Sequence, residues 1–213
     1  MMLSAADSIK PVARELEYAG YVIVPQFLDG DACAALAAEC RTLHAAAQLR
    51  PAAIGRAQAR HVREDIRGDR THWFDPAALT PAQTRYWPRM QALRIELNRA
   101  LLLGLDELEA HYALYPPGAR YSRHRDRFRD DDARVLSSVL YLNPEWREED
   151  GGALRLYLGA TSQNPHLDIY PYAGTLVLFL SAEFEHEVLP AMRERLSIAG
   201  WLQRRSEVRL TKS

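Results

Sequence analysis

The amino-acid sequence predicts an α+β protein in which helices come first and a two-layered β structure follows. Helical periodicity prevails over about the first hundred residues, whereas short runs rich in β-branched and aromatic residues follow Gly104. Turn-forming residues separate these runs, and the chain shows no regular alternation of strands with helices. Many short strands at such spacing favour a sandwich or a double-sheet jelly roll.

The first fifty residues are predicted to contain two helices with a strand between them. Residues 8–19 form an amphipathic segment, and the run YVIVP that begins at Tyr21 is typical of a strand. Asp29 or Asp31 can cap the Ala-rich helix that follows, which is expected to run to about residue 48.

A third helix is expected over about residues 81–103. The segment TPAQ, Thr80 to Gln83, supplies an N-cap, a proline at the first helical position and a reciprocal capping residue. Apolar residues then recur at helical spacing and indicate a buried face: Trp87, Met90, Leu93, Leu97 and Leu101.

Eight strands are predicted after Gly104. They are expected near residues 109–115, 119–125, 134–142, 153–158, 167–171, 174–180, 185–189 and 194–203. Neither an internal repeat nor a Gly/Ser-rich linker divides the chain. We therefore expect a single domain over residues 1–213, in which residues 1–104 form a mainly helical support and residues 105–203 form the β core.

Composition excludes several classes of partner. Hydrophobic residues make up 47% of the 213 residues and charged residues 26%, as in ordinary globular proteins. The formal net charge is -1, so no overall field attracts nucleic acid or an anionic membrane, and we expect neither as a partner. Cys33 and Cys40 lie on one face of a predicted helix and are expected to pack as reduced thiols. With no signal peptide or membrane-spanning run, the sequence indicates a cytoplasmic protein.

A candidate metal site begins in the charged segment YSRHRDRFRDDD, residues 121–132. Alternate residues of a strand point to the same side, so His124 and Asp126 can hold one ion together, while residues 127–132 are expected to form a solvated turn. His186 lies sixty residues after Asp126, on a later predicted strand. Two imidazoles and one carboxylate form the facial triad of non-haem Fe(II) oxygenases.

Spacing alone leaves alternatives open. His124 and Asp126 would also suit a solvated charged loop, and a second HxD pair stands at His166 and Asp168. The latter lies among turn signals, only eighteen residues before His186, and is interpreted as surface. What favours the first pair is Arg195, nine positions after His186 in the alternating strand RERLSIAGW. An inward-facing arginine requires an anion, and a dicarboxylic acid that also chelates iron satisfies this; an internal Asp or Glu is the alternative.

These motifs together resemble the Fe(II)- and 2-oxoglutarate-dependent dioxygenases, specifically the prolyl 4-hydroxylases of the oxygen-sensing PHD/EGLN type and their bacterial relatives. The likeness includes HxD at 124–126, HEVLPA at 186–191, the spacing from Arg195 to Trp201, and the segments ALYPPGARYSRHRD, VLYLNPEW and DGGALRLY. Upstream, IRGDRTHW at residues 66–73 is similar to a family stretch that leads into a substrate-covering loop, here expected near 60–85. The resemblance implies a double-stranded β-helix, a cupin-like jelly roll with N-terminal supporting helices.

The resemblance also implies a set of site residues. Fe(II) is expected on His124, Asp126 and His186, and the cosubstrates are 2-oxoglutarate and O2. Arg195 and Tyr141 are expected at the distal carboxylate of 2-oxoglutarate, Tyr115 near its chelating end and Leu154 in the pocket wall. The substrate side is expected to include the following residues: Arg67, Asp69, Trp73, Arg134 and Trp201. Asp69 and Arg134 match a pair that bridges the loop to the barrel in the family.

The implied activity is hydroxylation of a prolyl residue in a protein, coupled to decarboxylation of 2-oxoglutarate to succinate and CO2. Bacterial relatives act on a translation factor, so by analogy a translation factor is a candidate protein substrate. Hydroxylation of another residue or of a free amino acid, and a non-catalytic jelly-roll binding module, are the alternatives. Ala199 departs from the family, which carries a hydroxyl-bearing residue there, and this departure affects the surroundings of the cosubstrate rather than a ligand.

Overall fold

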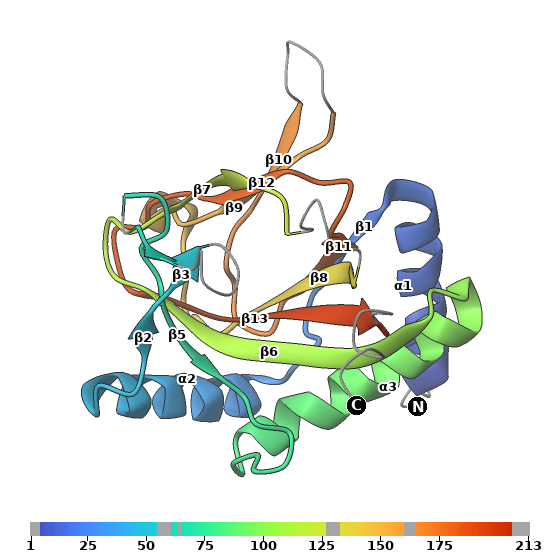
Figure 1. The fold of residues 1–213 in the computed structure, drawn as a ribbon, viewed down its shortest axis with the longest axis horizontal. Coiled ribbons are helices and arrows are strands. Elements are labelled where there is room, and N and C mark those ends of the chain that lie inside the picture. Colours follow the sequence, from blue (N-terminus) through green and yellow to red (C-terminus); the bar gives the residue numbers. More distant parts are fainter. Residues whose placement is uncertain (1–4, 55–60, 64, 127–132, 160–164, 206–213) are drawn as a thin grey trace.

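The computed structural model describes residues 5–54, 61–63, 65–126, 133–159 and 165–205. Two antiparallel sheets face each other as a double-stranded β-helix, and α-helices flank one side (Figure 1). The described α-helices are α1 (Ala5–Ala19), α2 (Gly30–Ala45) and α3 (Gln83–Leu101). The predicted α+β class, with helices ahead of a jelly-roll core, is confirmed.

The larger sheet has seven strands in the order β1-β11-β8-β13-β6-β5-β2. Their bounds are β1 (Tyr21–Val24), β2 (Arg50–Pro51), β5 (Arg70–Trp73), β6 (Leu105–Tyr115), β8 (Arg134–Tyr141), β11 (Leu176–Leu180) and β13 (Arg195–Arg204). The smaller sheet has the order β10-β9-β12-β7, with β7 (Tyr121–His124), β9 (Leu154–Tyr157), β10 (His166–Ile169) and β12 (His186–Val188). A separate ribbon consists of β3 (Ala53–Ile54) and β4 (His61–Val62).

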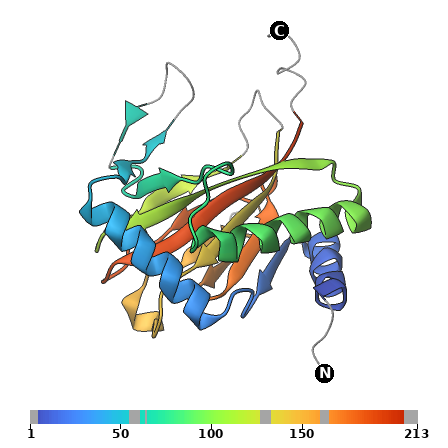
Figure 2. The same ribbon diagram turned by 90° about the horizontal axis from the view of Figure 1, so that it is seen from below.

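The helices cover the outer face of the larger sheet (Figure 2). Trp87, Met90, Leu93 and Leu97 of α3 are buried as predicted, whereas Leu101 is only partly buried. They belong to one apolar core with even-numbered residues of β13: Leu196, Ile198 and Leu202. Since side chains alternate along a strand, the odd-numbered residues of β13 point the other way, into the space between the sheets.

Local capping explains where α2 begins. The Asp29 side chain accepts a hydrogen bond from the backbone N–H of Ala32 at 2.8 Å, which makes it the N-cap of α2. Thr80 and Gln83 form the expected reciprocal pair, although regular helix begins only at Gln83. Cys33 and Cys40 are buried free thiols, as predicted. No α-helix in the described ranges combines the length and apolarity that crossing a membrane requires.

All eight strands predicted after Gly104 are present, with ends that differ by at most four residues. The sequence did not predict β2, β3, β4 or β5. These strands have two to four residues each, and β5 is defined by its pairing with residues 111–114 of β6. The turn expected at 127–132 lies outside the described residues, as do residues 60 and 64 of the expected loop.

Candidate metal centre

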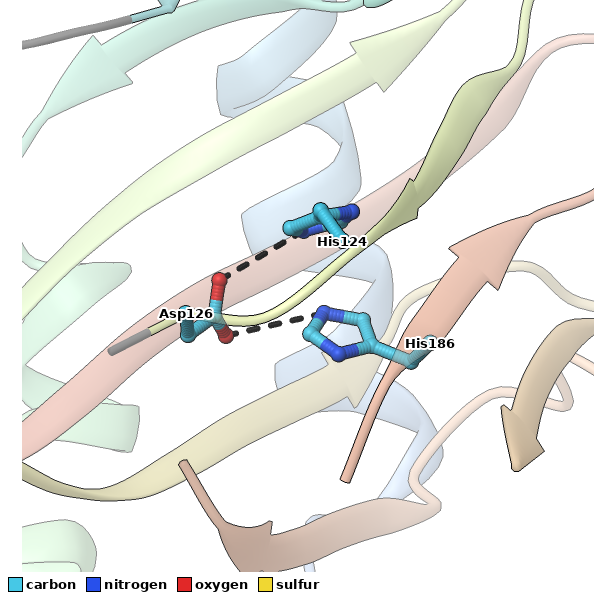
Figure 3. A group of neighbouring side chains, drawn as sticks. All are labelled: His124, Asp126 and His186. Carbon is cyan, nitrogen blue, oxygen red and sulfur yellow. Dashed lines mark ion pairs between the residues drawn. The ribbon is translucent and has the colours of Figure 1, made fainter. Parts of the chain in front are cut away.

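Two paired strands of the smaller sheet bring the predicted triad together. His124 is the last residue of β7, His186 is the first of β12, and the two stand directly opposite each other. Asp126 follows two residues after His124 and points toward both imidazoles (Figure 3). One ligand atom from each residue lies within 4.8 Å of the others, and in the described part of the chain this is the one group of at least three His, Cys, Asp or Glu side chains that meets this limit.

Hydrogen bonds turn both imidazoles toward the carboxylate. His124 Nδ1 lies 2.8 Å from the Ser122 carbonyl oxygen and His186 Nδ1 lies 3.4 Å from that of Phe184. Because a carbonyl only accepts, Nδ1 carries the hydrogen in each ring and Nε2 keeps its lone pair. The Nε2 atoms lie 3.5 Å and 3.6 Å from the Asp126 oxygens. Three ligand atoms therefore converge on one point.

The protonation states also suit a cation. Burial, reinforced by the neighbouring His124, lowers the pKa of His186 from 6.5 to about 4, so this imidazole is neutral at pH 7. Burial alone would raise the pKa of Asp126, but the two imidazoles and the Ser137 hydroxyl hold it well below its ordinary value. A neutral imidazole and an ionised carboxylate are the forms that bind a metal ion.

Arg195 lines the same cavity as the triad and lies between two tyrosine rings. It is 1% exposed, and its Cζ lies 5.2 Å from the ring centroid of Tyr115 and 5.1 Å from that of Tyr141. Nε donates to the Gly152 carbonyl at 2.8 Å and Nη1 to Ser197 Oγ at 3.3 Å, but Nη2 has no partner among the described residues. The buried Tyr141 hydroxyl also lacks one, and burial raises its pKa to about 12, so it remains a donor. Unpartnered buried donors require an acceptor, and a carboxylate supplies it.

A glycine allows the chain to pass beside Arg195. Gly152 has φ of +69°, and an added Cβ would lie 2.9 Å from Ala191 Cβ and 3.3 Å from Arg195 Cδ. Leu154, two residues later, lines the same cavity, as do Tyr115, Ala199 and Trp201. The cavity therefore contains the predicted triad, the predicted anion site and the Leu154 wall.

On the substrate side, the structure corrects one expectation. Asp69 does not pair with Arg134: its carboxylate is held by Arg67 at 2.7 Å, and Arg134 contacts Glu109 at 2.8 Å. Arg67 and Asp69 are two residues apart, so their side chains extend to the same side and form two parallel hydrogen bonds. Arg134 instead lies across the Trp201 ring, with Cζ 3.6 Å from its centroid.

The larger sheet carries a cluster of three aromatic rings that lies beside the triad. The central ring, His111, was not predicted from the sequence. His111 contacts Trp73 and Trp201, with ring centroids 4.5 Å and 5.5 Å apart. It is opposite Ala199 in the register and is 1% exposed, and neither ring nitrogen has a hydrogen-bond partner in the part of the chain that the structure describes. The alternation of side chains along the strand could have indicated His111, because residue 111 lies on the same side of β6 as Ala113 and Tyr115. Trp73 is 42% exposed and presents the cluster to solvent.

The buried His111 is expected to make stability depend on pH. Burial, aided by Arg67 and Arg134, keeps its pKa well below 6.5, so below pH 6.5 the unfolded chain binds a proton that the folded protein does not. Folding stability is therefore present above pH 6.5 and is lost as pH falls, by up to about 1.4 kcal/mol per pH unit from this residue. Urea unfolding of metal-free protein at pH 7.5 and 5.5 should show that His111→Phe loses less unfolding free energy between the two pH values than wild type does. Equal losses of unfolding free energy would contradict this role of His111.

Tyr121 is a second residue that sequence reasoning missed. Its ring stacks on His124 with centroids 3.6 Å apart and an interplanar angle of 19°. The Arg67 guanidinium carbon also lies over the Tyr121 ring, 4.7 Å from its centroid. Asp69, Arg67, Tyr121 and His124 thus form a continuous column from the segment before β5 to the triad. The structure places Arg67 in this column, against the ring that supports a predicted metal ligand.

Removing the Tyr121 ring is expected to loosen His124. Tyr121→Ala should weaken binding of Mn(II), used as a non-oxidising metal probe, by about three- to tenfold, the equivalent of one aromatic contact. Tyr121→Phe keeps the stacked ring and should bind as wild type does. Calorimetric titration of metal-free protein measures both, and equal affinity of the alanine variant and wild type would show that the stack has no positioning role.

Comparison with known proteins agrees with this geometry. The family model described as the 2OG-Fe(II) oxygenase superfamily matches residues 110–203. A Pseudomonas putida prolyl-4-hydroxylase of known structure is 47% identical, and the match covers 93% of this chain and 100% of that one, with a TM-score of 0.83. A prolyl hydroxylase from Trichoplax adhaerens, solved in complex with a hypoxia inducible factor oxygen degradation domain peptide fragment, is 25% identical, with coverage of 98% and 94% and a TM-score of 0.85.

A more distant structure shares only the fold. The non-heme alpha ketoglutarate dependent epimerase SnoN from nogalamycin biosynthesis is 17% identical, with coverage of 93% and 86% and a TM-score of 0.64. The fold thus occurs with different reactions, and the family assignment depends on the higher identity to the Pseudomonas putida protein together with the family match. This chain belongs to the 2OG-Fe(II) oxygenase superfamily, whose enzymes use Fe(II), 2-oxoglutarate and O2.

Proposed function

We propose that the protein is a prolyl hydroxylase that acts on a protein substrate. In this proposal His124, Asp126 and His186 bind Fe(II), and Arg195 with Tyr141 binds the distal carboxylate of 2-oxoglutarate. Tyr115 and Leu154 form the cosubstrate wall, and Arg67, Asp69, Trp73, Arg134 and Trp201 belong to the substrate side, with Arg67 and Asp69 acting through their mutual ion pair.

One observation carries the proposal. Nη2 of Arg195 and the hydroxyl of Tyr141 are buried donors without partners, and Arg195 shares its cavity with the triad. A metal triad alone suits many reactions, but a second, buried cationic end suits a dicarboxylic ligand that reaches from one to the other. 2-Oxoglutarate has one carboxylate for each end and a keto oxygen for the metal.

Bound iron and 2-oxoglutarate supply the oxidising chemistry, in which O2 is consumed, 2-oxoglutarate becomes succinate and CO2, and one oxygen atom enters a C–H bond of the substrate. The side chains orient the reactants and exclude water. Neither glutamate beside His186 is free to act as a base: Glu185 is paired with Arg123, and Glu187 accepts a hydrogen bond from the Tyr157 hydroxyl at 2.6 Å. The chain needs no general base for this reaction.

The choice of a prolyl substrate is supported by the relatives. The Pseudomonas putida relative is a prolyl-4-hydroxylase, and the Trichoplax adhaerens relative was solved with a peptide fragment of a protein. The exposed Trp73 and the buried Trp201 provide aromatic surface that suits a saturated ring and its peptide. We infer a cytoplasmic protein partner with a target proline, and a translation factor is the first candidate by analogy with bacterial relatives.

The decisive experiment is a peptide screen. Purified protein with Fe(II), 2-oxoglutarate and a library of proline-containing peptides should produce succinate, and mass spectrometry should locate one added oxygen atom on proline. Matched peptides with alanine at that position, and free proline, are the controls. The same incubation with a cell lysate then identifies which protein gains oxygen and tests the translation-factor candidate.

Each alternative has its own outcome in this experiment. Oxygen on a residue other than proline, or only on free proline, would refute the protein-directed prolyl assignment while keeping the oxygenase. A non-catalytic module would form no succinate and, in anaerobic titration of the folded protein with Fe(II) and 2-oxoglutarate, would not develop the visible charge-transfer band of their chelate.

A further inference from the structure

A buried pair of serines touches the triad from the opposite sheet. Ser137 lies in β8 of the larger sheet and is 1% exposed, and its Oγ lies 2.7 Å from Asp126 Oδ2. Ser181, the residue after β11, is fully buried, and its Oγ lies 2.8 Å from that of Ser137. This contact thus connects the larger sheet with a carboxylate that follows β7 of the smaller sheet.

The chemistry of these groups gives the hydrogen bonds a direction. An ionised carboxylate only accepts, so Ser137 must donate its single hydroxyl hydrogen to Asp126. The bond between the two serines must then be donated by Ser181 to Ser137. Hydrogen bonds are therefore donated from Ser181 to Ser137 and from Ser137 to Asp126. Each of these bonds polarises the next.

The position of Asp126 in the chain explains why such support is needed. The described pairing of β7 with β12 ends at His124, so Asp126 lies beyond the last paired residue of its strand. A carboxylate there can rotate unless another element holds it. Ser137 faces the space between the sheets because its register partners, Phe179 and Trp201, do so as well. The larger sheet thereby sets the orientation of Asp126 relative to His186.

We propose that Ser137 is a positioning residue for the metal ligand Asp126 and that Ser181 in turn orients Ser137. This inference rests on the proposed assignment of His124, Asp126 and His186 as the iron site. The hydrogen bond from Ser137 to Oδ2 would fix the orientation in which Asp126 offers its carboxylate to the ion.

The test is metal affinity of otherwise intact protein. Full-length protein is freed of metal with a chelator and titrated calorimetrically with Mn(II). Ser137→Ala should weaken binding by at least about tenfold, the usual effect of losing a partner of a metal ligand. Ser137→Thr keeps a hydroxyl and should retain most of the Mn(II) affinity. Ser181→Ala should lower the Mn(II) affinity about threefold, as expected for the loss of one hydrogen bond.

Ser138 offers a matched control. It is the next residue of β8, is 2% exposed and points to the opposite face, where its Oγ would lie 3.1 Å from a Cβ added at Gly200. Ser138→Ala removes the same atom from the same strand and should leave Mn(II) affinity unchanged. A role limited to folding would lower the melting temperature of both alanine variants without moving the affinity of either.

The outcomes separate this inference from the proposed function. If wild type binds Mn(II), Asp126→Ala does not, and Ser137→Ala binds as wild type does, the positioning role is refuted and the metal site stands. If Asp126→Ala binds Mn(II) as tightly as wild type, the metal assignment fails and this inference with it. Should Ser137→Ala not fold, Ser181→Ala decides: weaker binding supports the relay, and unchanged binding refutes it.

Discussion

Asp126→Ala is expected to abolish succinate formation, and His124→Ala is expected to do the same. Each removes one of three ligand atoms that lie within 4.8 Å of one another, and no neighbouring His, Cys, Asp or Glu of the described chain completes such a group in its place. The expected loss exceeds about a thousandfold, as for other residues without which the chemistry does not proceed. Succinate released per enzyme in the presence of Fe(II) and 2-oxoglutarate measures it.

The chain contains its own control for this prediction. His166 and Asp168 have the same HxD spacing, but His166 is exposed on β10 and Asp168 is held by Arg155 at 2.7 Å. His166→Ala should therefore retain wild-type turnover. Both triad variants should keep the circular dichroism of wild type, because the sheets are held by their ladders and cores. Retained turnover in Asp126→Ala and His124→Ala would refute the assignment of the triad.

Arg195→Met is expected to raise the KM for 2-oxoglutarate by at least about a hundredfold. Removing one partner of a buried ion pair costs about 3 kcal/mol or more, and each 1.4 kcal/mol corresponds to a factor of ten. The buried Nη2 atom has no hydrogen-bond partner within the described ranges, so its donor hydrogens are available to the ligand. Arg195→Lys keeps the charge but not the planar fork, and an intermediate KM is expected.

Two measurements make the Arg195 prediction specific. Mn(II) affinity without 2-oxoglutarate should be unchanged, since the hydrogen bonds of Arg195 go to Gly152 and Ser197 and not to a triad ligand. Arg155→Met serves as the control substitution, because Arg155 alternates with the inward-facing Leu154 and Leu156 and points away from the cavity. A KM equal to that of wild type in Arg195→Met would show that the cosubstrate binds elsewhere.

Periodicity and turn residues were sufficient to predict the larger elements. All eight strands after Gly104 and all three helices are where alternation, helical spacing and capping residues indicated. These signals are local, because they arise from the burial of one face of a strand or helix. The short strand β5 was missed since it exists through pairing with β6, some forty residues later in the chain.

In the candidate site, too, some residues were predicted from the sequence and others became evident only in the structure. His124, Asp126, His186 and Arg195 were found because their residue types and order are informative, and the structure brings them to one cavity. Tyr121, Ser137 and His111 were not found, although Ser137 is a polar residue on the inward side of an apolar strand. Nothing local distinguishes a serine that supports a metal ligand from one that merely fills a strand.

The sequence by itself determined the fold class, the order of the elements and the residues that we expect to bind a metal ion and a dicarboxylate. Only the tertiary structure decided which side chains act on them: Asp69 pairs with Arg67 rather than Arg134, Tyr121 stacks on His124, and Ser137 reaches Asp126 from the other sheet. The physical reason is that residue type and period are properties of a short segment, whereas these contacts depend on the register and spacing of strands far apart in the chain.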